Sequence, residues 1–157
     1  MKPYFINVME FGPVTMARIV NRIDPHRFDE RTGPDRFTLR EAIAHMADWE
    51  PILRGRIRTG VETPGASIEA YDEGELAEKN AYNAKNVSES LETYRRERAE
   101  TVRYVQGLSD DDLQKHFVHP ERGPLTISDM IYMMNGHDLY HIEHLTQYLA
   151  EKTSATW

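Results

Sequence analysis

The chain has 157 residues, no cysteine, and a formal net charge of -7 from 19 basic and 26 acidic side chains. A length near 150 residues is typical of one domain, so we expect residues 1–157 to form a single domain. Without cysteine the sequence cannot form thiolate zinc sites, iron–sulfur clusters or cysteine nucleophiles, and a metal would need histidine or carboxylate ligands. The acidic balance disfavours nucleic-acid binding. The apolar runs are too short for a membrane span or a secretory signal, which predicts a cytoplasmic protein.

The first half of the chain predicts two long helices. Apolar residues recur at helical spacing over 3–23, and Pro13 should kink this helix because proline removes a backbone hydrogen bond. A loop rich in glycine and proline should cover 24–37. A second helix should begin at the capping box Thr38-Leu39-Arg40-Glu41 and continue to about Arg58. The predicted apolar faces are Phe5, Val8, Met16, Ile19, Val20 and Ile23 in the first helix and Leu39, Ala42, Ile43, Met46, Trp49, Leu53 and Ile57 in the second.

The second half predicts two more long helices. A loop over 59–72 leads into the polar stretch 73–85, which we expect to form a short helix across the mouth of the bundle. The third long helix should cover 88–106, with the serine at its start as the cap, and a short capped turn follows it. After a loop at 119–124, the fourth helix should cover 126–151. Four long helices with long connections indicate an all-α four-helix bundle with long crossover loops.

Three of the seven histidines lie in the fourth predicted helix, within a stretch of eight residues. His137 and His141 are four residues apart, so they project from one apolar face one turn apart, where two neutral imidazoles can bind a single metal ion. His144 lies about 10 Å along the axis from His137, too far to share that ion easily. A third ligand must come from another helix, and His45 is the best placed. The alternative is that these imidazoles are structural residues with hydrogen-bond partners in the core.

Charged residues also fall on the predicted apolar faces. Asp138 follows His137 where a zincin metalloprotease has glutamate, which disfavours that class. Arg98 and Glu50 lie within the apolar faces of the third and second helices, and a buried charge needs a partner. We therefore expect Arg98 to form a buried ion pair with Asp138 or Glu50. Alternatively, Asp138 orients an imidazole or anchors a substrate.

Two segments of the sequence resemble the DinB family. At residues 33–50 stands GPDRFTLREAIAHMADWE, which is similar to the family's glycine and aromatic residue, capped serine or threonine, and helix ending in a histidine and an acidic tail. At residues 123–145 stands GPLTISDMIYMMNGHDLYHIEHL, which is similar to the family's final helix, where HDxxH is a frequent form. The sequence departs from a common pattern at His144, where glutamine often follows the second ligand, so no role is carried over to that position.

The resemblance to the DinB and YfiT-like superfamily implies a four-helix bundle, often dimeric, with a divalent metal on His45, His137 and His141 and open positions for water or substrate. Some relatives transfer or isomerise substrates with low-molecular-weight thiols such as bacillithiol, mycothiol or glutathione. We therefore expect a metal-dependent thiol S-transferase that acts on a small electrophile as a homodimer. A metal-dependent hydrolase, a non-catalytic metal or small-molecule binding protein, and a purely structural bundle are the alternatives. Nitrogen ligands suit zinc, nickel, iron and copper, so the metal stays open.

Overall fold

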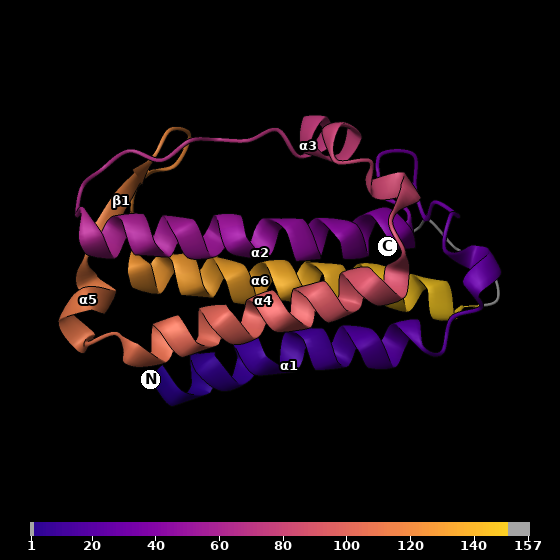
Figure 1. Cartoon of the computed structure of the whole chain (residues 1–157), viewed down its shortest axis with the longest axis horizontal. Coiled ribbons are helices and arrows are strands. Elements are labelled where there is room, and N and C mark those ends of the chain that lie inside the picture. The colour runs from indigo at the N-terminus through magenta and orange to yellow at the C-terminus, as the bar shows by residue number, and fades with distance from the viewer. Residues whose placement is uncertain (1, 151–157) are drawn as a thin grey trace.

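The computed structural model describes residues 2–150 and consists mainly of helices (Figure 1). Four of them are long: α1 (Lys2–Val20), α2 (Leu39–Glu62), α4 (Val87–Gly107) and α6 (Ile127–Thr146). Shorter elements connect them: η1 (Pro25–Arg27), α3 (Glu73–Lys79), η2 (Tyr82–Ala84), α5 (Asp110–Gln114), β1 (His116–His119), β2 (Gly123–Thr126) and η3 (Gln147–Leu149). The predicted all-α four-helix bundle is confirmed.

Each long helix of the bundle packs against two others. α1 contacts α4 and α6, and α2 contacts the same two helices from the other side. Figure 1 shows α1 and α6 running in one direction and α2 and α4 in the other. Because α2 and α4 are parallel, the chain between them, residues 63–86, must return along the bundle. This is the predicted long crossover, and it carries α3.

The helix starts follow from local side-chain chemistry. Thr38 and Glu41 form the predicted capping box of α2, and Thr126 forms another with Asp129 at the start of α6. The predicted cap at Ser88 is wrong. Asn86 caps α4, since its side chain accepts a hydrogen bond from the backbone N–H of the third helical residue, and the helix therefore begins at Val87.

The helix ends differ from the sequence prediction by a few residues. α1 runs through Pro13 and ends at Val20, and α2 continues four residues beyond Arg58 to Glu62. α6 ends at Thr146 and gives way to the turn η3. The predicted end of this last helix at residue 151 lies outside the described residues.

A small β-hairpin occupies much of the segment that was predicted to be a loop. β1 and β2 pair antiparallel, with His116 opposite Thr126 and His119 opposite Gly123. The backbone of the crossover adds to this hairpin, because Ile68 donates to the Val118 carbonyl at 3.0 Å. The hairpin therefore holds the beginning of the crossover beside the end of α2.

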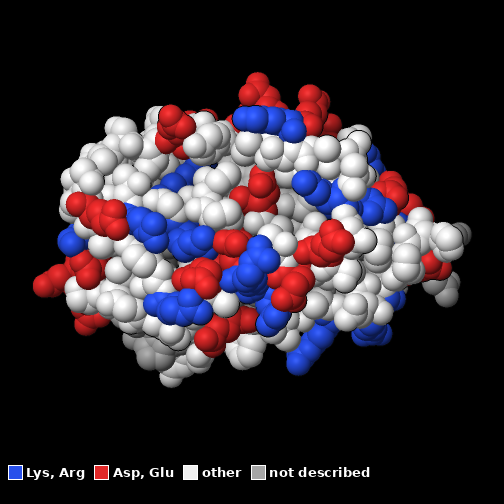
Figure 2. All heavy atoms as spheres, viewed as in Figure 1, with Lys and Arg blue, Asp and Glu red and all other residues white. Residues whose placement is uncertain are grey.

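The core fills the space between the four helices. One predicted apolar position of the first helix is wrong: Val8 is 46% exposed, whereas Ile6 and Met9, which the predicted apolar face omitted, are buried. No helix among the described residues has the length and apolar character needed to cross a membrane. On the face in Figure 2, basic and acidic side chains are interspersed. Exposed neighbours on α4 form ion pairs, such as Arg95–Glu92 and Arg103–Glu100.

Candidate metal centre

The three predicted histidines meet between α2 and α6. His45 projects from α2, and His137 and His141 project from α6 one turn apart, as their spacing predicts. His137 Nε2 lies 3.0 Å from His45 Nε2 and 3.2 Å from His141 Nε2. One ring nitrogen from each residue lies within 4.8 Å of the other two, so the three lone pairs can be directed at one point.

These distances suit a shared metal ion. Two nitrogens bound about 2.0–2.1 Å from one ion, at angles between octahedral and tetrahedral, are about 2.9–3.4 Å apart. The two Nε2 distances from His137 fall within this range. Nδ1 of His45 and of His141 is buried with no hydrogen-bond partner among the described residues. A donor to Nδ1 would place the ring proton on Nε2 and remove the lone pair that binds a metal. Because neither ring has such a donor there, both can present Nε2 to an ion.

Burial keeps the three imidazoles neutral. Desolvation, followed by the positive charge that His137 would carry, lowers the pKa of His45 to about 3. Burial likewise lowers the pKa of His141 well below its ordinary value and also lowers the pKa of His137. Metal ligation needs deprotonated imidazole, so the site is ready to bind an ion at neutral pH without first releasing protons.

Asp138, the neighbour of His137, belongs to a buried ion-pair network. Arg98 donates to both carboxylates of the prediction: its Nε bonds Glu50 at 2.8 Å, and one terminal nitrogen bonds Asp138 at 2.8 Å. Tyr94 donates its hydroxyl to the same Asp138 oxygen at 2.8 Å. The predicted pairing is confirmed with both partners, and within residues 2–150 the side-chain hydrogen bonds of Asp138 lead to α4 rather than to an imidazole.

His144 lies outside the trio, as its spacing predicts. Its ring centroid is 6.3 Å from that of His141, and its Nε2 is buried with no hydrogen-bond partner among the described residues. Burial and the nearby charge of Arg36 lower its pKa to about 4, so it too is neutral at pH 7.

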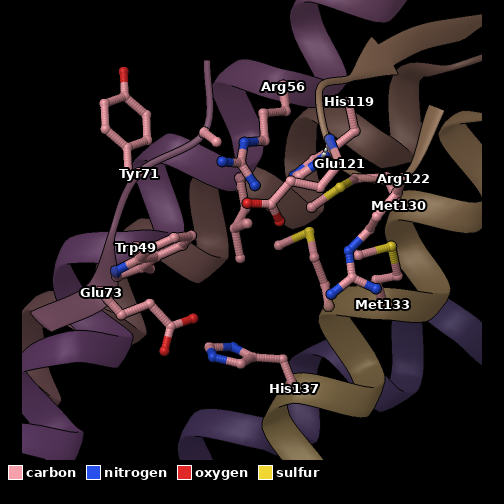
Figure 3. Close-up of a pocket in the computed structure, with 13 residues that line it drawn as sticks. Trp49, Arg56, Tyr71, Glu73, His119, Glu121, Arg122, Met130, Met133 and His137 are labelled. Atoms are coloured by element: carbon pink, nitrogen blue, oxygen red, sulfur yellow. Dashed lines mark hydrogen bonds between the residues drawn. The ribbon is translucent and has the colours of Figure 1, made fainter. Parts of the chain in front are cut away.

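A cavity of about 360 Å³ opens beside His137. Figure 3 shows its walls, which come from α2, the crossover, the hairpin and α6. Trp49, Leu53 and methionines of α6 form its apolar part. The sequence did not predict five further polar residues of the lining, which are Arg56, Glu73, His119, Glu121 and Arg122. The one local signal was the position of Arg56, seven residues after Trp49 and thus on the same face of α2.

Glu73 lies across the cavity from the histidine trio. Its carboxyl points toward the His137 ring in Figure 3. Desolvation by the surrounding walls, together with the neighbouring Asp72 carboxylate, raises the pKa of Glu73 above its ordinary value. A carboxyl group with a raised pKa is a better proton acceptor than an ordinary glutamate, so Glu73 is suited to take up a proton from a substrate.

The sequence matches the family model of the DinB superfamily over residues 10–145. A protein of Oceanobacillus iheyensis, named as a candidate metal-dependent hydrolase, is 26% identical over 94% of this chain and 86% of its own length. A protein of Bacillus mycoides with the same kind of name is 25% identical over 90% of this chain and 82% of its own length.

Two solved structures share the fold. YfiT from Bacillus subtilis, described as a probable metal-dependent hydrolase with an unusual four-helix bundle topology, superposes with a TM-score of 0.88 at 22% identity, covering 94% of this chain and 85% of YfiT. The mycothiol-dependent maleylpyruvate isomerase superposes with a TM-score of 0.75 at 14% identity, covering 92% of this chain and 60% of the longer isomerase.

Proposed function

The chain belongs to the DinB superfamily, and on this basis we propose that it is a metal-dependent enzyme with a divalent ion on His45, His137 and His141. One observation carries the proposal: three neutral histidines, of which His45 and His141 are buried and His137 is half-buried, converge through Nε2 beside a cavity large enough for a small molecule. The names of the relatives from Oceanobacillus iheyensis and Bacillus mycoides support it, since both refer to metal dependence.

When bound by three neutral ligands, a divalent ion keeps its full charge and open positions, and it supplies a Lewis acid that lowers the pKa of a coordinated thiol or water. The chain contains no cysteine, so a sulfur nucleophile would have to come from a substrate. Zinc, nickel, iron and copper all accept nitrogen ligands.

We propose thiol transfer as the reaction. The thiol loses its proton, its sulfur forms a bond to an electrophilic carbon, and the leaving group departs with the bonding electrons. Glu73, which faces His137, is placed to accept the proton. The apolar side chains of Trp49, Leu53 and Met130 would hold the carbon skeleton of the electrophile. The shared fold of the mycothiol-dependent isomerase supports this reaction class.

Hydrolysis is the second candidate, because the same carboxyl group suits it. In this reaction Glu73 would take a proton from water, the oxygen would attack the substrate, and the proton would pass to the leaving group. The relatives named as candidate hydrolases favour this reading. The two reactions differ in one respect that can be measured: only transfer requires an external thiol.

Metal content tests the ion site. His137→Ala should abolish stoichiometric metal, measured by elemental analysis of untagged protein dialysed against a trace of the metal. His144→Ala should retain most of it, because this ring lies outside the trio. Equal metal content in the wild type and His137→Ala would reject the assignment.

Turnover tests the reaction. Loss of an activated chloroarene is followed with each candidate thiol, without thiol, and with chelator. Transfer predicts dependence on both metal and thiol, with release of one chloride for each thiol consumed. Turnover that persists without thiol would replace the transferase by a hydrolase. No turnover of chloroarenes or esters by the metal-loaded protein would favour a non-catalytic binding protein.

A further inference from the structure

Arg56 is a buried guanidinium at the end of the cavity away from His137 (Figure 3). The residue is 8% exposed, and its Nε has no hydrogen-bond partner in the described part of the chain. One terminal nitrogen donates to the backbone carbonyl of Glu69 at 3.1 Å, and no carboxylate among residues 2–150 forms an ion pair with it. A buried charge without a counter-ion costs free energy, so its retention calls for a partner from outside the chain.

The neighbouring arginines of α2 show that the fold otherwise supplies carboxylates. Arg54 pairs with Glu97 at 2.8 Å, and Arg58 pairs with Glu62 at 3.8 Å. Arg56 instead lies over the Trp49 ring, with its guanidinium carbon 5.5 Å from the ring centroid. Trp49 thereby fixes the guanidinium in the cavity wall without neutralising it.

We propose that the cavity binds a small molecule that carries a carboxylate, with Arg56 as its anchor. This inference rests on the proposed function, because it places the carboxylate at one end of the substrate and the reacting group at the histidine trio. The planar guanidinium can donate two parallel hydrogen bonds to a carboxylate, a geometry that lysine lacks. Arg122 also points into the cavity in Figure 3, so the lining carries a second guanidinium. Trp49 and Met130 provide apolar contacts for the chain between the two ends.

Two acidic residues of the cavity offer the opposite charge. Glu121 is exposed and also points into the cavity in Figure 3, so in the free protein its carboxylate can swing toward Arg56 and compete with a ligand. Replacing it by Glu121→Gln should therefore strengthen carboxylate binding. If instead the carboxylates of Glu121 and Glu73 determine the charge of the bound molecule, the cavity should prefer a cation.

Calorimetry on the metal-free protein, prepared with chelator, separates these possibilities. The probes are hexanoate, hexanamide and hexylamine, which share an apolar chain and differ in charge. We expect hexanoate to bind at least about tenfold more tightly than the other two. Arg56→Met should weaken hexanoate binding roughly ten- to hundredfold, the factor expected for one hydrogen bond between charged groups. The matched control Arg58→Met, two residues along α2 and exposed, should leave affinity within about twofold of the wild type.

Arg56→Lys provides a second variant, which keeps the positive charge and loses the planar pair of N–H donors. It should bind hexanoate with intermediate affinity. Circular dichroism confirms that each variant is folded before titration. Tighter binding of hexylamine than of hexanoate would overturn the proposal. So would equal hexanoate affinities of Arg56→Met and the wild type. Because no metal is present, failure here leaves the proposed metal site untouched, and failure of metal binding leaves this result standing.

Matched substrates then show which reactant carries the carboxylate. With metal-loaded protein, mercaptopropionate is compared with mercaptoethanol, and chloronitrobenzoate is compared with chlorodinitrobenzene. Arg56→Met should raise KM only for the reactant that bears the carboxylate and leave its neutral analogue unchanged. An equal rise in KM for both members of each pair would show that Arg56 shapes the cavity rather than binds an anion.

Discussion

Replacing Arg98 by methionine should destabilise the protein more than any surface change on the same helix. Arg98 is 2% exposed and donates hydrogen bonds to Glu50, to Asp138 and to the backbone carbonyl of Met9. Arg98→Met would leave two buried carboxylates without their cation. Removing one partner of a buried pair costs about 3–5 kcal/mol, and a domain of this size is stable by about 5–15 kcal/mol. The melting temperature should therefore fall by roughly 6–20 °C.

Urea unfolding of the metal-free protein, followed by circular dichroism, measures the loss. Arg103→Met is the control. Like Arg98, Arg103 pairs with a glutamate, in its case Glu100 at 2.6 Å, but its side chain is 69% exposed. This control should cost less than about 1 kcal/mol. Glu50→Gln should cost less than Arg98→Met, because Arg98 keeps Asp138 and the Met9 carbonyl. Equal midpoints for Arg98→Met and the wild type would refute the view that Arg98 neutralises two buried carboxylates.

Three further predictions concern packing, pH and assembly. Gly12→Ala should destabilise the protein by about 1–3 kcal/mol, because the added Cβ would overlap the Asp138 carboxylate. Gly55→Ala is the control: its Cβ meets nothing within 4 Å, so it should stabilise α2 by up to about 1 kcal/mol. Thermal melts compare the two variants. The pKa of His45 is lowered from 6.5 to about 3, so between these values the unfolded chain binds a proton that the folded chain does not. The free energy of unfolding of the metal-free protein should therefore fall as pH decreases through this window, by about 1.4 kcal/mol per pH unit from this residue. A urea unfolding midpoint that stays constant from pH 7 to pH 5 would contradict this prediction. The predicted homodimer would use the exposed side of α1, where the apolar side chain of Phe11 is 63% exposed. Phe11→Glu should therefore yield monomers in light scattering. An unchanged dimer mass would exclude this side of α1 as the interface.

The histidine trio was predictable because its signals are local. The spacing of His137 and His141 fixes their common face whatever the rest of the chain does, since successive helical residues turn by about 100°. The capping boxes at Thr38 and Thr126 are equally local, because the side chain and the backbone groups that it satisfies lie within three residues. His45 required one further step, namely that α2 and α6 are neighbours in the bundle.

The cavity was not predictable, because its polar residues come from three separate parts of the chain, namely α2, the crossover and the hairpin. Arg56 reads as another polar residue of α2, and only the fold shows that no carboxylate of residues 2–150 pairs with it. Glu73 reaches the site because the hairpin holds the crossover against α2, through contacts such as that between Ile68 and Val118. Those strands are four residues long and interrupted by polar residues, so they give too little alternation to distinguish them from a loop.

The ion-pair network and the histidine trio meet on α6 at adjacent residues. His137 faces α2 and the cavity, whereas Asp138 faces α4, where Tyr94 and Arg98 hold its carboxylate. α1 can approach this carboxylate because Gly12 has no Cβ to overlap it. Since neighbouring helical residues are separated by a fixed rotation, holding Asp138 also fixes the direction in which His137 projects. A buried ion pair adds little net stability over an apolar core, so we infer that its benefit lies in this alignment, which keeps His137 Nε2 within 3.0 Å of His45 Nε2.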